Sequence, residues 1–138
     1  KIYFSSGEDL GAIFEAKADG SGTTKIILPV TMPIVGDVST DGKRLLISAV
    51  KDPKNTDIYL YDLTVTPPSL TRLTSDLSMD VEPVFLSDTE VIFSSNRTGE
   101  FEIWKHELPT STDVQLTTGG GTKVNPDVFE HEIVFVEY

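Results

Sequence analysis

Short apolar runs alternate with polar turns along the whole chain, and one unit of this pattern recurs. The clearest copy spans residues 91–108, where two apolar runs flank a polar turn that contains Arg97 and Gly99. Residues 1–18 and 44–63 have the same layout with other side chains. The runs are short, rich in β-branched and aromatic residues, and bounded by Gly, Pro, Asp, Asn or Ser, which is typical of β-strands. No window shows a convincing helical periodicity.

Equivalent positions of this unit recur with one period. The first apolar runs begin 43, 46 and 42 residues apart, at Ile2, Leu45, Val91 and Ile133. The second runs begin 45 residues apart each time, at Ile13, Ile58 and Ile103. A third set of landmarks has similar spacings of 47 and 43 residues, at Lys25, Arg72 and Gln115. Periods in this range are typical of solenoids and propellers.

Each period accommodates four strands, which we letter A to D. Strand A is expected at residues 37–39, 83–86 and 126–129, and the apolar runs form strands B and C. An Asp41-Gly42 turn, suited to positive φ, joins A to B. Leu-Thr pairs at residues 73–74 and 116–117 are expected in strand D. Repeated four-stranded antiparallel units describe the blades of an all-β propeller.

The predicted organisation is one propeller segment of about three repeats. It comprises a partial blade at 1–36, complete blades at 37–82 and 83–125, and a partial blade at 126–138. Closed propellers need at least about four blades. We therefore expect part of a longer propeller, or half of a six-bladed ring completed by a second copy. Because the chain starts at Lys1 without an initiator Met, either a targeting segment was removed or the chain begins inside a longer protein.

The repeat resembles the propeller blade of TolB-like proteins, and the resemblance covers nearly the whole chain. It rests on Ser39, Asp41, Gly42, Lys43, Ile47, Ser48, Ile58 and Tyr59, and on Pro83, Ser87, Asp88, Ser95, Arg97, Gly99, Ile103, Trp104, Leu116 and Thr117. Residues 7–9 and 51–55 depart from the family's Arg-x-Gly turn, and residues 129–132 lack its Asp-Gly turn. Related repeats occur in the periplasmic Tol protein, in prolyl-oligopeptidase-like enzymes and in several lyases, so the resemblance implies the blade type and leaves the activity open.

Composition narrows the classes of partner. Twenty-two acidic residues against 11 basic ones give a net charge of −11, which excludes nucleic acid as an expected partner. The acidic surplus serves the solubility of a β-rich surface, or it suits a cationic protein partner or ligand. The chain has no cysteine, so disulfides and thiolate metal sites are excluded. No apolar run approaches the roughly 18 residues of a membrane-spanning helix, and we expect no membrane insertion.

Motifs for catalysis, metals and cofactors are missing. The Gly-x-Ser-x-Gly pattern of a nucleophile elbow does not occur. The two histidines, His106 and His131, fall on different parts of their blades, which argues against a shared metal site. Gly119, Gly120 and Gly121 precede no predicted helix and are expected to form a flexible D–A connection, with no phosphate cradle. We therefore expect no catalytic residue, no metal and no cofactor.

The candidate partner-binding residues lie in the loops that differ between repeats. The D–A and B–C connections meet at one end of a propeller, around its axial opening. They are expected at residues 7–11, 29–36, 51–56, 76–82, 96–100 and 119–125. Their polar residues Asp80, Glu82, Arg97 and Asn125 are the predicted contacts. A second interpretation of Arg97 is that it fixes its own turn, and Trp104 is expected to pack between blades.

The leading functional prediction is a non-enzymatic protein-interaction or scaffold module in a bacterial periplasm or cell envelope. It would present rigid loops and an acidic face to a protein partner. One alternative is the propeller portion of a larger oligopeptidase or polysaccharide lyase, where it would gate or position the substrate. Another is a half propeller that assembles with a second copy.

Overall fold

The computed structural model describes residues 1–52 and 55–138, which form thirteen β-strands in four antiparallel sheets. The first sheet contains β1 (Ile2–Ser5), β2 (Ala12–Ala16) and β3 (Thr24–Ile27). The second contains β4 (Thr31–Val38), β5 (Arg44–Asp52), β6 (Asn55–Asp62) and β7 (Ser69–Arg72). The third contains β8 (Asp80–Phe85), β9 (Glu90–Ser95), β10 (Glu102–Glu107) and β11 (Thr112–Gln115), and the last is the hairpin of β12 (Lys123–Phe129) and β13 (Glu132–Glu137).

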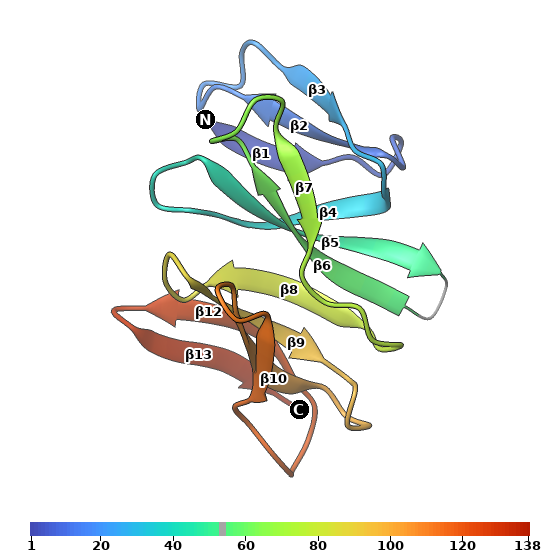
Figure 1. The fold of residues 1–138 in the computed structure, drawn as a ribbon, viewed down its shortest axis with the longest axis vertical. Helices are drawn as coiled ribbons and strands as arrows, with labels where there is room; N and C mark the ends of the chain where they lie inside the picture. Colours follow the sequence, from blue (N-terminus) through green and yellow to red (C-terminus); the bar gives the residue numbers. More distant parts are fainter. Residues whose placement is uncertain (53–54) are drawn as a thin grey trace.

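Within each sheet, every strand pairs with the next one in the sequence, so every sheet is a simple antiparallel meander. The first three sheets follow one another in chain order along the long axis of the molecule, and the hairpin of β12 and β13 lies beside the third sheet (Figure 1). This arrangement confirms the predicted all-β fold with four-stranded blades. In the part of the chain that the structure describes, no helix is long and apolar enough to cross a membrane. The predicted 51–56 loop includes residues 53 and 54, which lie outside the described residues.

The A strands begin earlier than the sequence predicted. They start at Thr31, Asp80 and Lys123, ahead of the expected starts at residues 37, 83 and 126. Two of the predicted A strands start at a proline, a residue that has no N–H for a sheet hydrogen bond. In the structure a β-bulge at each proline lets the pairing continue on its N-terminal side.

The Leu-Thr pairs follow the D strands and do not belong to them, since β7 ends at Arg72 and β11 at Gln115. The hydroxyl Oγ1 of Thr74 accepts a hydrogen bond from the backbone N–H of Ile58 at 3.0 Å. Thr117 accepts the same bond from Ile103 at 2.8 Å. The recurring threonine therefore accepts a hydrogen bond from a backbone N–H of strand C, which explains why it occurs at this position of the repeat.

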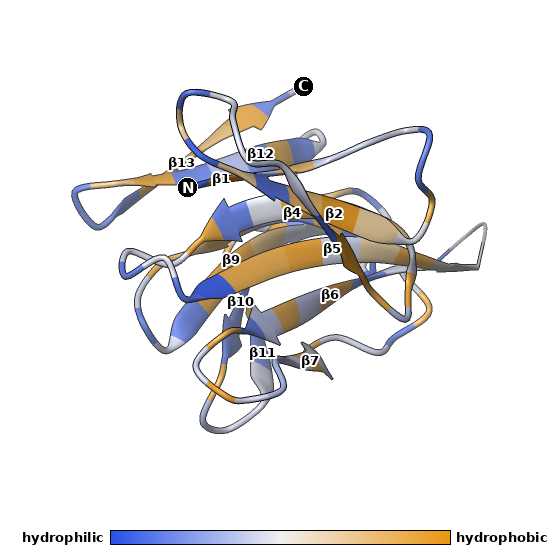
Figure 2. Ribbon diagram, turned by 90° about the horizontal axis from the view of Figure 1, so that it is seen from above, coloured by the Kyte–Doolittle hydropathy of each residue, from blue (hydrophilic) through white to orange (hydrophobic). Residues whose placement is uncertain are grey.

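The core lies between neighbouring blades, because an internal blade is covered on both faces. Leu45, Leu46 and Ile47, consecutive on β5, are all 0% exposed. The middle segments of β2, β5 and β9 are accordingly hydrophobic (Figure 2). A run that is apolar at every position is typical of strands buried on both faces.

The second and third sheets approach closely through their A strands. A Cβ atom added at Gly36 of β4 would lie 2.5 Å from the carbonyl oxygen of Pro83 on β8 and 2.8 Å from its ring. The adjacent Asp37 accepts a hydrogen bond from the backbone N–H of Phe85 at 2.9 Å through Oδ2. The A strands of successive blades therefore lie side by side and form the inner wall of the arc.

Candidate functional site

A groove of about 880 Å³ opens where the A strands of three blades meet. Its wall is largely aliphatic and includes Ile34, Val50 and Val81. The charged side chains that line it, among the described residues, are all acidic: Asp37, Glu82 and Asp127. We call this feature the axial groove. It combines an apolar wall with a few polar groups, as ligand-binding sites usually do.

Three residues at equivalent positions of β4, β8 and β12 project from bulges into the axial groove. These bulge residues, Met32, Glu82 and Asn125, have positive φ angles of 50°, 56° and 52°. Each one precedes a proline and sits at a register shift of its strand. A left-handed backbone is uncommon for residues other than glycine, and a following proline normally favours extended geometry. The same unfavourable backbone thus recurs three times around one groove.

The bulge residues of the third and fourth sheets are linked. Oε2 of Glu82 accepts a hydrogen bond from the backbone N–H of Asn125 at 2.6 Å. The same oxygen accepts a hydrogen bond from Oγ of Ser94 at 3.0 Å. Two of the four residues that the sequence singled out, 43 positions apart in the chain, are therefore in direct contact at the groove.

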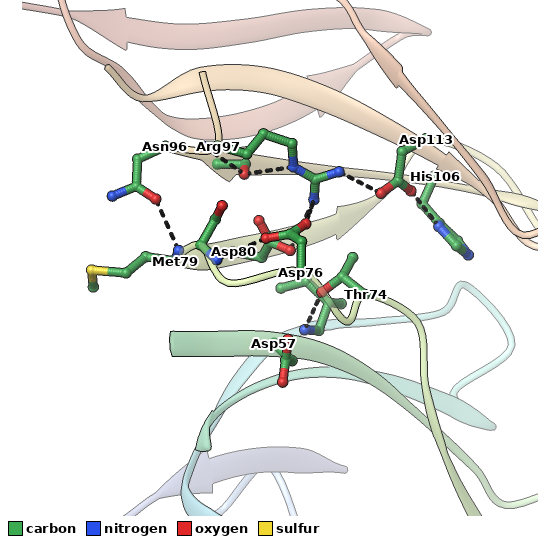
Figure 3. Close-up of polar contacts among 12 residues, drawn as sticks. Asp57, Thr74, Asp76, Met79, Asp80, Asn96, Arg97, His106 and Asp113 are labelled. Atoms are coloured by element: carbon green, nitrogen blue, oxygen red, sulfur yellow. Dashed lines mark hydrogen bonds and ion pairs between the residues drawn. The ribbon is translucent and has the colours of Figure 1, made fainter. Parts of the chain in front are cut away.

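The other two, Asp80 and Arg97, lie in a partly buried charge cluster (Figure 3). Nη2 of Arg97 is 2.9 Å from Oδ2 of Asp80 and 2.8 Å from Oδ2 of Asp76. Its Nη1 is 2.6 Å from Oδ2 of Asp113, and its Nε donates to Oγ of Ser95 at 2.9 Å. The side chain of Asp80 is completely buried. These contacts hold the B–C turn against the D–A connection and strand D.

Aromatic rings complete the surroundings of Arg97. Its guanidinium carbon lies 4.5 Å from the ring centroid of Trp104 and 5.3 Å from that of Phe93, as in cation–π contacts. Nδ1 of His106, which is buried, lies 2.6 Å from Oδ1 of Asp113. The four predicted residues thus separate into two groups, with Glu82 and Asn125 in the axial groove and Asp80 and Arg97 in the charge cluster.

Burial and charge shift the pKa values within the cluster. Burial raises the pKa of Asp80 despite the opposing hydrogen bonds of Ser95 and Thr74 and the positive charge of Arg97. Burial also works against ionisation of Asp113, but its hydrogen bonds to His106 and Arg97 outweigh this effect and lower its pKa. For Arg97, burial is outweighed by its bonds to Asp113 and Asp80, so its pKa is raised and it stays charged.

Lys123 on β12 occupies the position that corresponds to Asp80 on β8, with the opposite charge. The residue is only 5% exposed, and its ammonium group donates to the carbonyl oxygens of Gly119, Gly120 and Gly121. Oε2 of Glu102 lies 3.4 Å away. The glycine-rich connection, for which the sequence predicted only a flexible loop, therefore folds around a lysine of its own chain.

Met32 was not predicted as a groove residue, and Asp76 and Asp113 were not predicted as the acidic partners of Arg97. The prolines at the start of successive A strands were a usable signal for the bulges. His106 lies on β10, and His131 lies in the turn between β12 and β13. Across residues 1–52 and 55–138, no group of three or more His, Cys, Asp or Glu side chains could hold a metal ion.

Two curated relatives of this chain have the same name and come from two strains of one species. The Tol-Pal system protein TolB of Helicobacter pylori strain J99 is 29% identical over 136 residues, covering 97% of this chain and 32% of that protein. The Tol-Pal system protein TolB of strain 26695 is 33% identical over 107 residues, covering 76% of this chain and 25% of that protein. The chain therefore spans a third or less of the length of these relatives. No protein-family model matches it.

Solved structures share the fold. TolB from Acinetobacter baumannii superposes with a TM-score of 0.74 at 23% identity, over 99% of this chain and 34% of that one. A putative TolB from Agrobacterium tumefaciens gives a TM-score of 0.69 at 22% identity, over 92% of this chain and 50% of that one. These similarities confirm the propeller fold.

Proposed function

Because the chain belongs to the TolB-like β-propeller repeat family, we propose that it is a non-enzymatic interaction module that binds a protein partner at the axial groove. The curated relatives are named as proteins of the Tol-Pal system, so we place the partner in a system of that kind and the chain in the bacterial periplasm. The observation that carries the proposal is the groove itself, an apolar concavity surrounded by acidic groups.

Shape and charge explain how such a surface recognises a partner. When a partner covers the aliphatic wall and removes it from water, the complex is stabilised by roughly 25 cal/mol per Å² of buried apolar surface. The acidic residues and the net charge of −11 attract a complementary basic surface and accelerate the encounter. Specific protein interfaces bury more than about 1,000 Å² in total. The adjoining D–A and B–C loops therefore extend the contact beyond the groove.

Site-specific photo-crosslinking in the source organism tests this proposal. Ile34 lines the groove and is 57% exposed, so a benzophenone amino acid at this position faces any bound partner. Val65, in the connection between β6 and β7, is 45% exposed outside the groove and serves as the matched control. We expect a discrete adduct with one other protein, identified by mass spectrometry, at Ile34 and none at Val65. No adduct at Ile34, or equal adducts at both positions, would contradict the proposal.

Exposed apolar residues on the outermost blades favour a second function, assembly with another copy of the chain. Ile2 and Phe4 on β1 are 45% and 40% exposed. Their counterparts in the next blade, Leu45 and Ile47, are 0% exposed because the preceding blade covers them. Val134 on β13 is likewise 50% exposed. We infer that the outer faces of two copies cover each other and complete a ring of about six blades.

Light scattering after size-exclusion chromatography measures this assembly directly. We expect a mass near twice 15.1 kDa. Replacing Phe4 by lysine places a charge in the proposed contact and should return the particle to the monomer mass. A monomeric wild-type protein would overturn the assembly and leave the partner-binding proposal intact.

A further inference from the structure

We propose that the bulge residues Met32, Glu82 and Asn125 are the specificity-determining positions of the axial groove, which selects an extended peptide segment with one basic side chain among aliphatic ones. This inference rests on the proposed function and names the chemistry of the partner.

The backbone at the bulges is constant whereas the side chain changes. The three φ angles differ by only a few degrees, yet the side chains are a thioether, a carboxylate and an amide. A left-handed backbone is unfavourable for a residue other than glycine. Glycine adopts this conformation freely, but none of the three positions is glycine. Each of the three blades thus has a residue with a side chain at a position where glycine would relieve the backbone strain. All three of these side chains line the groove.

Each bulge side chain offers a different contact. Met32 is a flexible apolar group that adapts to an irregular partner. The amide of Asn125 is exposed and can both donate and accept hydrogen bonds. Glu82 uses only Oε2 for its bonds to the N–H of Asn125 and to Ser94. Its Oε1 accepts no hydrogen bond from the described residues, so it is available to a donor on a partner.

The negative charge of the groove favours a partner with a basic side chain. Asp37 is occupied, since its two oxygens accept hydrogen bonds from the backbone N–H groups of Val38 and Phe85. Glu82 and the exposed Asp127 remain to face a ligand. A basic side chain there forms a charge-assisted hydrogen bond with Oε1 of Glu82. An anionic segment is repelled, since the described residues contribute no basic side chain to the lining.

The apolar wall distinguishes a peptide from a bare metal ion. Calcium takes six to eight oxygen ligands at about 2.3–2.6 Å. Most of the lining is instead aliphatic and includes Ile34, Val81 and Val84. These side chains favour a partner with apolar groups on either side of its charge. An extended segment meets this requirement because its side chains alternate in direction along the chain.

Selection of short random peptides displayed on phage tests the inference on the purified protein. We expect the recovered peptides to carry one Lys or Arg flanked by Ile, Leu or Val. Glu82→Gln keeps an oxygen that can accept the Asn125 amide hydrogen but removes the charge. It should weaken the best peptide about tenfold or more, measured by calorimetry. Met32→Glu adds a second carboxylate to the groove and should shift the selection towards peptides with two basic residues.

Two controls separate recognition from folding. Glu130→Gln removes an equal charge in the turn between β12 and β13, outside the groove lining, and should leave peptide affinity unchanged. Replacing the basic residue of the peptide by methionine should abolish its sensitivity to Glu82→Gln, which is the coupling expected of a direct contact. Equal weakening by the two glutamine variants, or recovered peptides without a basic residue, would overturn the inference. If crosslinking at Ile34 succeeds in that case, the proposed function stands and only the assigned chemistry fails.

Discussion

Replacing Arg97 by methionine is expected to lower the free energy of unfolding by about 3–5 kcal/mol at neutral pH. The guanidinium group is the shared partner of Asp76, Asp80 and Asp113, and Asp80 is completely buried. Methionine retains much of the packing against Trp104 but leaves a buried carboxylate without its cation. Urea denaturation followed by tryptophan fluorescence measures the loss, since the chain has a single tryptophan beside the cluster.

The matched control is an ion pair at the surface. Lys25 lies 2.6 Å from Asp9, and both side chains are more than 40% exposed. Lys25→Met should cost only about 0–1 kcal/mol, because water screens exposed pairs. If Arg97→Met costs no more than this control, the cluster does not contribute to stability as argued.

The deficit of the Arg97 variant should depend on pH. Burial already raises the pKa of Asp80, and loss of the cation raises it further. A carboxyl group whose pKa is raised on folding contributes stability below its unfolded pKa of about 3.9 and loses it as pH rises through the folded pKa. The variant should therefore lie closest to the wild type in acid and furthest from it near neutral pH. A deficit that is independent of pH would contradict this origin.

The wild-type protein should itself lose stability in acid. The pKa of Asp113 is lowered by its bonds to His106 and Arg97, so its contribution is present above the unfolded pKa and is lost as pH falls. Arg97 contacts both aspartates, so its removal changes both contributions. Unfolding curves of both proteins over one pH series therefore measure the combined effect of Arg97 on Asp80 and Asp113.

Replacing Gly36 by alanine is expected to have the second large effect and to lower the free energy of unfolding by about 1–3 kcal/mol. The new methyl group would lie 2.5 Å from the carbonyl oxygen of Pro83, and a backbone atom of a packed strand cannot move aside cheaply. The second and third blades must therefore separate. Gly7→Ala is the control, since no heavy atom lies within 4 Å of the added carbon, and its effect should stay within about 0.5 kcal/mol.

Thermal unfolding of the two alanine variants decides the point. A clearly lower midpoint for Gly36→Ala alone would show that close packing of the A strands is needed. Equal midpoints would mean that the interface between blades adapts to an added methyl group. Because Gly36 also lines the axial groove, the same variant should weaken crosslinking at Ile34.

Local patterns determined the blades. Alternating apolar runs with a period near 44 residues specify strands that must be covered on both faces, and only neighbouring repeats can cover them. Turn chemistry was equally readable, since the predicted Asp41-Gly42 turn holds Gly42 at a φ of 71°. Such features depend on residues that are close in the sequence, which is why they could be predicted.

Strand limits and the candidate site depended on contacts between blades. A proline normally keeps the residue before it extended, so the positive φ angles of Met32, Glu82 and Asn125 contradict the local preference and could not be predicted from it. Whether Arg97 contacts a partner or fixes its own turn depended equally on distant residues. The structure surrounds it with carboxylates from the D–A connection and from strands A and D.

The sequence alone therefore determined the repeat, the four-stranded blade and the acidic character of the surface. Only the packing of one blade against the next decided which polar residues are buried with a partner and which remain available in the groove. The physical reason is that strand formation is set by side-chain alternation within a few residues. The burial and pairing of a charge instead depend on atoms that tertiary structure brings from elsewhere in the chain.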